Sequence, residues 1–409
     1  MSEQWTDRLL GDLFTLEYGA SLSDAVRRPG QVAVYGSNGC VGFHDISLCS
    51  GPGIIVGRKG SVGQVCWSKD DFWPIDTTYY VQPKNNIEFR WLYWLLLQCN
   101  LSKLNSSTGV PGLNRNDAYS QVAYAPPLVE QHAIATILDS VDEAIRQTDA
   151  VIVKLRQVKA GMLHDLLTCG LDENGELRDP IRHPEQFKGS PIGLIPKGWE
   201  IITMVEACSK GGGSIQTGPF GSQLHAEDYV KQGTPIITVE HIGELEIVHK
   251  NLPQVCDQDL FRLRKYTLAM NDLVFSRVGA IDRCAMVSKN EDGWLFSGRC
   301  LRVRPGKQGI NSKYLCYQLN SHRCRTWILN NSVGSTMKCL NTTILGLVPL
   351  LLSAKHEQEQ IGTILFEFDQ QIREGSKDLA KLHVIKQGLM HDLLTGKVRV
   401  PKNLLEATS

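Results

Sequence analysis

The sequence predicts an α+β protein in which two globular α/β blocks are separated by two long antiparallel helices. Three observations support this fold class. The helical stretch 130–168 returns as 357–395, about 227 positions later, without a gap and with 18 of 39 residues identical. Short β-like runs fill the region before each copy, and similar Gly- and Asn-containing loops precede both helices. Block and helix therefore repeat as one unit, which predicts an approximate two-fold axis.

Both helical stretches carry apolar residues at heptad spacing. This spacing is typical of a seam for one partner helix, so the two copies can form a coiled coil with each other. At ~1.5 Å per residue, each helix would reach about 58 Å. The long linker between the copies brings the chain back and favours an antiparallel pair. The seam residues are Ile134, Val141, Leu155, Met162, Leu138, Ile145, Ile152 and Leu166 in the first helix, and Ile361, Phe368, Leu382, Leu389, Leu365, Ile372, Leu379 and Leu393 in the second.

The elements follow in a fixed order along the chain. In the first block, β-like runs are broken by Gly, Asn and Asp, and an amphipathic helix is expected at 88–104. Four prolines make the linker an ordered but irregular connector. We expect a first block at 1–125, a central long helix at 126–168, a linker at 169–199, a second block at 200–348, a distal long helix at 349–396 and a C-terminal tail at 397–409.

Composition limits the kind of protein. The formal net charge is zero, which argues weakly against non-specific binding to nucleic acids. The 12 cysteines are scattered without a CxxC pair, so we expect free thiols in a reducing compartment and no metal site. The N-terminus has no signal-peptide pattern, and the longest apolar run, 345–352, contains a proline and is too short to span a membrane. The sequence predicts a cytoplasmic protein without membrane contact.

Catalytic motifs are absent from the sequence. It contains no phosphate-binding loop, no dinucleotide fingerprint, no GxSxG elbow and no HExxH helix. The pair Pro126-Pro127 is preceded by Ala125 and followed by Leu128, so it is not the motif with which amino-methyltransferases hold a flipped base. His164 and His391 lie near helix ends, where a basic side chain stabilises the C-terminus. We therefore expect a non-catalytic protein without a cofactor of its own.

Several motifs resemble those of one family. They are the linker segment DENGELRDP…HPEQFK with IPKGWE (172–200), the EQxxI opening of each helix, and GLMHDLLTG (388–396). VYGSNGCVGFHD (34–45) and IQTGPFGSQLHAEDY (215–229) resemble target-recognition segments. Nearly the whole chain is similar to the DNA-specificity subunits of type I restriction–modification systems.

This resemblance implies a division of labour. Each block would be a target-recognition domain that reads one half of a split double-stranded DNA sequence, with the helix pair as a ruler for the gap. The chain would recruit two methyltransferase subunits, which hold S-adenosylmethionine, and restriction subunits with motor and nuclease activity. The two blocks carry different loops, YGSNG against QTGPFGSQ, so we expect an asymmetric target.

Candidate DNA-binding residues lie in Gly-rich loops and in the loop before each helix. Arginine or lysine beside a glycine can approach a phosphate or a guanine edge, and short hydroxyl or amide groups suit base edges. The alternatives are solvated turn charges, turn formation and, for the repeated asparagines, capping. The candidates are Ser37, Asn38, Arg58, Lys59, Thr108, Asn114, Ser222, Gln223, Arg277, Arg283, Thr336, Lys338 and Asn341.

Two other functions fit parts of the sequence. The chain could be the recognition part of a fused methyltransferase–nuclease, but that enzyme needs a catalytic domain whose motifs this sequence lacks. It could also be a non-catalytic coiled-coil scaffold without a nucleic-acid role. The scaffold hypothesis gives no reason for two β-rich blocks.

Overall fold

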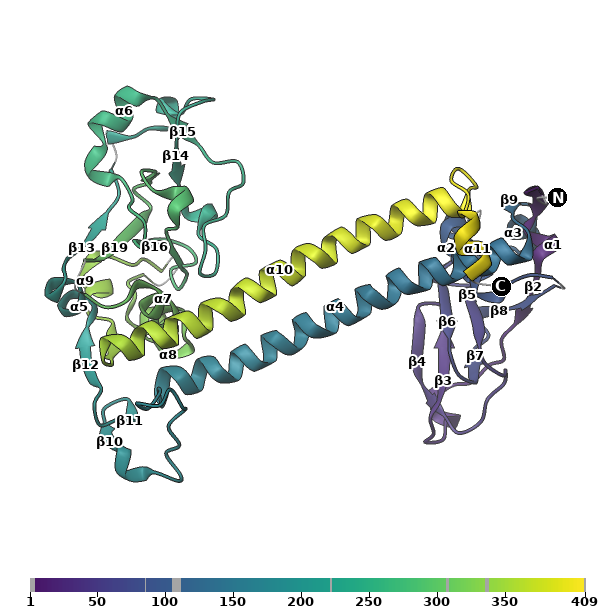
Figure 1. Ribbon diagram of the computed structural model, residues 1–409, viewed down its shortest axis with the longest axis horizontal. Helices are drawn as coiled ribbons and strands as arrows, with labels where there is room; N and C mark the ends of the chain where they lie inside the picture. Colours follow the sequence, from purple (N-terminus) through teal and green to yellow (C-terminus); the bar gives the residue numbers. More distant parts are fainter. Residues whose placement is uncertain are drawn as a thin grey trace. The chain divides into compact units, whose positions relative to one another are not determined.

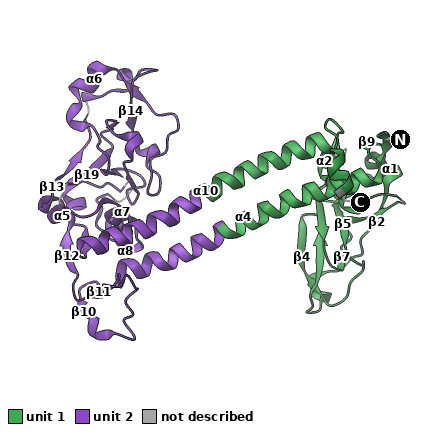
Figure 2. Cartoon of the chain, in the orientation of Figure 1, with its two compact units in different colours: residues 1–151, 375–409 green, residues 152–374 purple. Residues whose placement is uncertain are grey.

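The structure, a computed structural model, consists of two compact units, each with one globular block. Unit 1 holds residues 1–151 and 375–409, and unit 2 holds residues 152–374 (Figure 2). Both contain a portion of the long helices α4 (Leu128–Thr168) and α10 (Lys355–Leu394). The residues that the structure describes are 4–84, 86–104, 112–220, 223–306, 309–334 and 338–407.

Block 1 precedes α4 (Figure 1). Two of its helices begin at polar caps; at one of them, the Glu88 carboxylate accepts a hydrogen bond from the backbone N–H of Arg90. The elements are β1 (Thr6–Leu9), α1 (Leu10–Leu13), β2 (Phe14–Tyr18), β3 (Val32–Gly36), β4 (Gly39–His44), β5 (Gly53–Gly57), β6 (Val65–Ser68), β7 (Phe72–Pro74), β8 (Thr78–Pro83), α2 (Phe89–Cys99), α3 (Arg115–Tyr119) and β9 (Val122–Ala125).

The linker and block 2 follow α4. The linker contains one hairpin, formed by β10 (Phe187–Ser190) and β11 (Gly193–Pro196). The elements of block 2 are β12 (Glu200–Thr203), α5 (Met204–Lys210), β13 (Gly212–Thr217), β14 (Thr234–Ile237), β15 (Gln254–Val255), α6 (Asp257–Arg262), β16 (Leu273–Ser276), β17 (Cys284–Met286), β18 (Leu295–Phe296), β19 (Cys300–Gly306), α7 (Ser312–Asn320), α8 (His322–Asn331), α9 (Thr342–Gly346) and β20 (Pro349–Leu352).

The two blocks share one strand topology. Block 1 has an antiparallel sheet of order β2-β8-β5-β6, a sheet β4-β3-β7 in which β3 and β7 are parallel, and the pair β1-β9. Block 2 has β13-β19-β16-β17, then β15-β14-β18 with β14 and β18 parallel, and the pair β12-β20. Each strand of block 1 thus has a counterpart in block 2 in the same chain order. This confirms the predicted internal repeat and extends it to strands whose sequences show no similarity.

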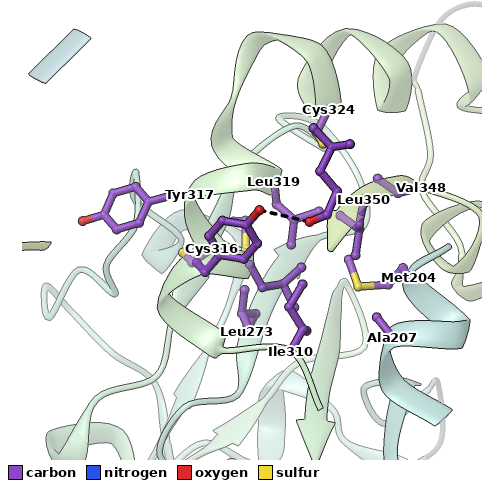
Figure 3. Packing of buried hydrophobic residues seen from close by; sticks show 14 of the residues in the cluster. Met204, Ala207, Leu273, Ile310, Cys316, Tyr317, Leu319, Cys324, Val348 and Leu350 are labelled. Atoms are coloured by element: carbon purple, nitrogen blue, oxygen red, sulfur yellow. Dashed lines mark hydrogen bonds between the residues drawn. The ribbon is translucent and has the colours of Figure 1, made fainter. Parts of the chain in front are cut away.

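Each block packs its apolar core against the nearer part of the long helices. In unit 1, Trp91 and Trp94 of α2 are fully buried in one cluster with Ile134 of α4. In unit 2, the core includes Met204, Leu273, Ile310 and Leu350, which pack together beside α7 (Figure 3). Ile361 and Leu365 of α10 belong to the same cluster. The start of each long helix is therefore part of a block core.

The predicted heptad seam is confirmed. All sixteen seam residues are buried or half-buried, whereas most of their neighbours on both helices are exposed. In unit 1, Lys386 of α10 pairs with Asp142 of α4 at 2.5 Å; in unit 2, Lys159 of α4 pairs with Asp369 of α10 at 2.5 Å. The ion pair of Lys159 lies later in α4 than that of Asp142, but its partner Asp369 lies earlier in α10 than Lys386. This order is expected for antiparallel helices.

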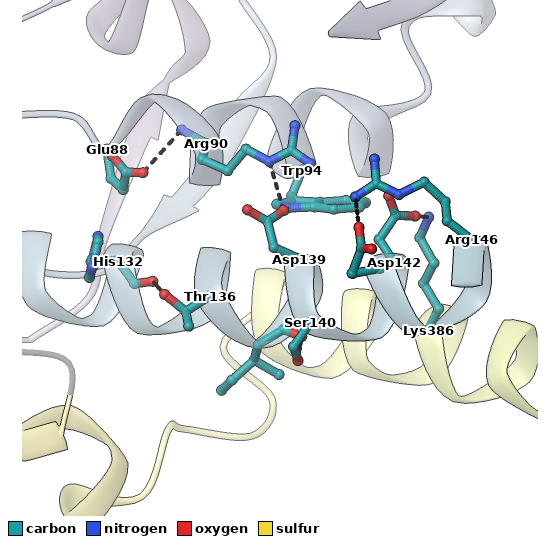
Figure 4. Close-up of polar contacts among 12 residues, drawn as sticks. Glu88, Arg90, Trp94, His132, Thr136, Asp139, Ser140, Asp142, Arg146 and Lys386 are labelled. Carbon is teal, nitrogen blue, oxygen red and sulfur yellow. Dashed lines mark hydrogen bonds and ion pairs between the residues drawn. The ribbon is translucent and has the colours of Figure 1, made fainter. Parts of the chain in front are cut away.

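The helix α2 fixes block 1 to α4 through a cluster of charged and aromatic groups (Figure 4). Asp139 accepts hydrogen bonds from the Arg90 Nε at 2.7 Å and the Trp94 indole N–H at 2.9 Å. Lys386, paired with Asp142, lies 4.8 Å from the Trp94 ring. Asp139 is thus held by side chains of α2, and Asp142 by a side chain of α10.

Unit 2 repeats part of this junction. Asp369 accepts a hydrogen bond from the Tyr317 hydroxyl of α7 at 2.6 Å, and Lys159 lies 5.6 Å from the Tyr317 ring. Burial, together with the hydrogen bond to Asp369, raises the pKa of Tyr317, so the phenol stays a neutral donor. The ion-paired residues of the two junctions occupy equivalent positions of the repeat, since Asp142 corresponds to Asp369 and Lys159 to Lys386.

A buried glutamate holds the start of each long helix. In unit 2, Glu357 accepts hydrogen bonds from the Trp199 indole at 3.0 Å, the Leu171 N–H at 2.8 Å and Arg178 at 2.6 Å. In unit 1, Glu130 accepts from the Trp5 indole at 2.8 Å, the Val400 N–H at 3.2 Å and Arg399 at 2.6 Å. We call each set a clasp. Each clasp ties a helix start to the segment that follows the other helix.

The unit 1 clasp is expected to weaken in acid. Burial acts to raise the pKa of Glu130, but the hydrogen bonds from Arg399, Trp5 and Val400 outweigh it and lower the pKa. A depressed carboxylate pKa stabilises the fold above the unfolded value of about 4.3, and this stability is lost as the pH falls through the folded pKa. We expect Glu130→Gln to lower stability at pH 7 and to flatten its fall below about pH 4.5. Chemical denaturation across pH 3–7 measures this.

The exposed Asp149 on the same helix supplies the control. Asp149→Asn is expected to leave both the stability at pH 7 and its acid dependence unchanged. An acid profile of Glu130→Gln that matches that of the unsubstituted protein would contradict the role of the clasp.

The distal helix starts later than the sequence suggested. The interval 349–396 opens with β20, whose residues pair with β12, Thr203 opposite Pro349 and Glu200 opposite Leu352. The helix α10 begins only at Lys355. The C-terminal tail contains a further short helix, α11 (Lys402–Ala407), after the clasp residues. No helix in the described part of the chain is long and apolar enough to cross a membrane.

Candidate nucleic-acid interface

The carboxyl ends of β2, β3, β5 and β7 meet at one edge of block 1. The Ile75 N–H, just after β7, donates to the Tyr35 carbonyl of β3 at 2.9 Å. Gly57 ends β5 where a Cβ would lie 2.8 Å from the Ser37 carbonyl oxygen, so the position favours glycine. The β3–β4 turn at Ser37 therefore lies against the loop that carries Arg58.

Two guanidinium groups flank the exposed ring of Tyr18 at this edge. The Cζ atoms of Arg58 and Arg115 lie 4.7 Å and 4.3 Å from the ring centroid. Arg58 also donates to the Asp76 carbonyl and Arg115 to the Leu16 carbonyl, both at 2.9 Å. The hydrogen bond with Arg115 lowers the pKa of Tyr18. Within the described part of block 1, neither guanidinium has a carboxylate partner, so the cluster suits an anionic ligand.

Block 2 builds the same edge with the same backbone contacts. The Ser297 N–H after β18 donates to the Ile237 carbonyl of β14 at 2.9 Å, as Ile75 does in block 1. Arg277 follows β16 as Arg58 follows β5, and the Leu340 N–H donates to its carbonyl at 2.8 Å. In block 1, the Leu113 N–H makes this bond to Arg58 at 2.9 Å. Arg58 and Arg277 are therefore structural equivalents.

The edge of block 2 is hollowed into a cleft of about 820 Å³. Phe220, which follows β13, lines the cleft with its ring 53% exposed. The guanidinium carbon of Arg277 lies 4.8 Å from this ring. Arg299 and Glu240 lie on the wall. The equivalent edge of each block thus presents an arginine on an exposed aromatic ring at the ends of the strands.

This chemistry suits DNA. Arginine binds phosphates and, in a fixed plane, the O6 and N7 atoms of guanine, while short polar side chains in loops reach base edges. No cluster of metal-ligating side chains occurs among the described residues. Burial raises the pKa of Cys208 and Cys300 to about 11, which keeps them as thiols.

Comparison with protein families fits this geometry. The family described as the type I restriction modification DNA specificity domain matches residues 2–156 and, a second time, residues 196–382. The two matches cover most of the chain and coincide with its two repeats. The chain belongs to this family.

Relatives of this specificity-domain protein extend over most of its length. The MjaVIII specificity subunit of Methanocaldococcus jannaschii is 24% identical over 358 residues, 86% of this chain and 77% of that protein. The EcoBI specificity subunit of Escherichia coli is 23% identical over 362 residues, 84% and 73% of the two chains. The crystal structure of the S subunit from M. genitalium has a TM-score of 0.67 at 18% identity and covers 95% and 96%, which shows a common fold.

The specificity-domain fold brings some predicted residues together and not others. Ser37, Asn38, Arg58 and Lys59 lie at the block 1 edge, where Asn38 and Lys59 are exposed. In block 2, Arg277 lies in the cleft and the exposed Arg283 lies in the β16–β17 turn.

Other candidates have structural partners. The Gln223 side chain accepts a hydrogen bond from the Tyr266 hydroxyl at 2.8 Å, and the Lys338 ammonium donates to the Leu329 carbonyl at 2.6 Å. Asn114 and Asn341 cap α3 and α9: each side-chain oxygen accepts an N–H at 2.8 Å. The two asparagines therefore have the capping role that was the alternative to DNA contact. Contact between their amide NH₂ groups and DNA stays a prediction. Thr108, Ser222 and Thr336 lie outside the described residues.

Sequence reasoning missed four residues of the two edges: Tyr18, Arg115, Phe220 and Arg299. Arg115 directly follows the repeated Leu113-Asn114 pair, but the second copy has a threonine at this position, so the repeat gave no signal for it. Phe220 lies within the segment 215–229, but its apolar side chain does not by itself indicate contact with DNA. An exposed aromatic in a Gly-rich loop before a strand-end arginine is the signal that could have found it.

Proposed function

We propose that this specificity-domain protein reads a split, asymmetric DNA target through two recognition domains, block 1 at 1–125 and block 2 at 200–348. The observation that carries the proposal is the repeated edge, where Arg58 on Tyr18 and Arg277 on Phe220 end equivalent strands of one topology. The proposed asymmetry of the DNA target follows from the differences between the edges of the two blocks. Block 1 adds Arg115 to its aromatic ring, whereas block 2 opens a cleft beside its own.

In this proposal α4 and α10 act as the ruler that sets the unread gap. A coiled coil of 41- and 40-residue helices is stiff, and each helix start is built into a block core and held by a clasp. A rigid separator fixes half-site spacing geometrically.

The chain itself contributes binding and no catalysis. The EcoBI and MjaVIII relatives are named as specificity subunits of restriction enzymes, which supports assembly with catalytic partners. The partners would be two methyltransferase subunits, which supply S-adenosylmethionine, and restriction subunits with motor and nuclease activity. The complex would work in the cytoplasm on double-stranded DNA.

Methylation mapping tests the proposal. The protein is co-expressed with the methyltransferase of the same system, and modified adenines are mapped across the host genome. We expect one split motif with a fixed gap and two different halves. A soluble complex that leaves the genome unmodified would contradict it, and a palindromic motif would contradict its asymmetry. Failure to bind either DNA or a methyltransferase would favour a coiled-coil scaffold.

Lengthening both helices is expected to lengthen the gap. Seven residues inserted into α4 between Asp142 and Lys159, and seven into α10 between Asp369 and Lys386, keep the heptad seam and both ion pairs. They add ~10.5 Å, or about 3 base pairs at ~3.4 Å each. The mapped motif should keep its two halves and gain that spacing.

A matched control inserts the seven residues into α4 alone. It breaks the pairing of the seam and is expected to destabilise the protein instead of moving the half-sites. Methylation with the original gap by the complex of the doubly extended protein would contradict the proposed role of the helices as a ruler.

A further inference from the structure

We infer that Arg277, stacked on Phe220, recognises a guanine in the half-site bound by block 2, and that Phe220 is the positioning residue for it. The inference rests on the proposed function and deepens it, because it assigns one base and one side chain. Three features of the cleft support the inference. They are the contacts that hold Arg277, the N–H donors of its guanidinium group that the described residues leave free, and the charged side chains around it.

The backbone of Arg277 is held on both sides. Its N–H donates to the Arg299 carbonyl at 2.8 Å, and its own carbonyl accepts the Leu340 N–H at 2.8 Å. The guanidinium carbon Cζ of Arg277 lies over the Phe220 ring, 4.8 Å from its centroid. This contact restricts the side chain and lowers the entropy lost when the guanidinium binds a ligand. Arg277 is therefore prepared for a ligand that needs two parallel hydrogen bonds.

The donors of Arg277 have no partner among the described residues. Within the described part of the chain, its guanidinium makes no ion pair and no hydrogen bond. Other arginines of block 2 are already engaged: Arg304 binds the Asp272 carboxylate at 2.5 Å, and Arg302 donates to the Thr267 carbonyl at 3.1 Å. The edge of a stacked guanidinium with free N–H groups matches the O6 and N7 acceptors of guanine.

The surroundings favour a base over a phosphate. The exposed carboxylate of Glu240 lines the same cleft and repels a phosphate, whereas it can accept a hydrogen bond from the N4 amino group of cytosine. Arg299 on the wall and Arg283 in the next turn are exposed and have no ring partner among the described residues, as suits groups that contact phosphates. His225 and His241 also line the cleft. The charges of the cleft thus fit a G·C pair read by Arg277.

The chain offers a matched control in Arg264. Its guanidinium carbon lies 4.9 Å from the ring of the exposed Phe261, the same arrangement as Arg277 on Phe220. Neither Arg264 nor Phe261 lines the cleft. A substitution there removes an arginine stacked on phenylalanine from the same unit without touching the proposed site.

The experiment selects bound sequences from a random double-stranded DNA library with the full chain in complex with its methyltransferase. We expect a G·C pair in one half-site, and Arg277→Lys to reduce discrimination at that pair about 10- to 100-fold while the other positions stay unchanged. Phe220→Leu, which keeps the arginine but removes the ring, should reduce discrimination at the same pair. Phe220→Tyr, which keeps an aromatic ring, should leave the discrimination unchanged. Arg264→Lys should change nothing. Arg58→Lys acts on block 1 and should spare this pair.

Other results would overturn the inference. If Arg277→Lys weakens all sequences equally, or Arg277→Ala flattens the salt dependence by about one phosphate contact, Arg277 binds the backbone and reads no base. Relaxation of the same pair by Arg264→Lys, or a selected motif without G·C in the half that responds to Arg277, would also refute it. If the unsubstituted complex selects a split motif, these failures leave the proposed function intact. If it selects no sequence, the proposed function fails, and this inference fails with it.

Discussion

Replacing Glu357 with alanine is expected to lower the free energy of unfolding by about 3–5 kcal/mol, because the change leaves a buried cation without its partner. The Arg178 side chain is 18% exposed and Glu357 5% exposed, so water compensates little. The Trp199 indole, with 1% of its surface exposed, also loses its acceptor. The midpoint and slope of chemical denaturation, followed by circular dichroism, measure the loss.

Two comparisons separate the clasp from a general effect of charge. Glu359→Ala removes an exposed carboxylate two residues further along α10 and should change stability by less than about 0.5 kcal/mol. Glu130→Ala removes the equivalent clasp in unit 1, where the Arg399 side chain is 50% exposed and can be hydrated, so a smaller loss is expected. Equal losses for Glu357→Ala and Glu359→Ala would refute the buried clasp.

The long helices and their pairing could be predicted because both depend on local periodicity. The seam repeats every seven residues, and the two copies share 18 of 39 residues. The identities also mark tertiary contacts, since Asp142 and Lys159 recur as Asp369 and Lys386. The clasps could not be predicted in this way. Trp5 lies 125 positions before Glu130, and nothing near either residue indicates that they meet.

The repeated Glu-Gln at the start of each helix also has a structural explanation. The buried Gln131 accepts the Glu88 N–H at 2.9 Å and donates to the Pro126 carbonyl at 2.8 Å. Gln358 makes the equivalent bonds in unit 2, to the Asn311 N–H at 2.9 Å and the Ser353 carbonyl at 2.7 Å. Both residues of the motif thus join the helix start to its block. The motif recurs in both copies of the repeat, and each copy makes this joint.

The strand-end edges of the two blocks were predictable only in part. Arg58 and Arg277 could be found because a glycine beside a charged residue after a β-like run is a local pattern. The stacking of Arg115 on Tyr18 joins residues nearly a hundred positions apart and arises only in the folded sheet. The start of the distal helix failed for the same reason: Pro349 to Leu352 pair with a strand about 150 residues earlier. Sequence therefore located loops and periodic helices, and missed what long-range packing decides.

Reversing the charge of Asp369 is expected to destabilise the protein by about 3 kcal/mol or more, because Asp369→Lys removes the acceptor of two partly buried donors. Lys159 is 18% exposed and Asp369 14%, and the Tyr317 hydroxyl donates to the same carboxylate. The new lysine would also lie beside Lys159. Chemical denaturation measures the loss, and Glu367→Lys, on an exposed position two residues earlier, is the control.

The double variant that exchanges the two charges separates pairing from side-chain shape. Lys159→Asp with Asp369→Lys restores an ion pair between α4 and α10, so the double variant should be more stable than the sum of the single variants by about 2–3 kcal/mol. Additive effects would mean that the pair contributes no coupling between the helices. If the helices set the gap, the complex of the exchanged protein with the methyltransferase should methylate the original motif with the original spacing, because the seam is untouched. A shifted gap in this variant would show that the ion pairs, rather than the apolar seam, fix the register of the ruler.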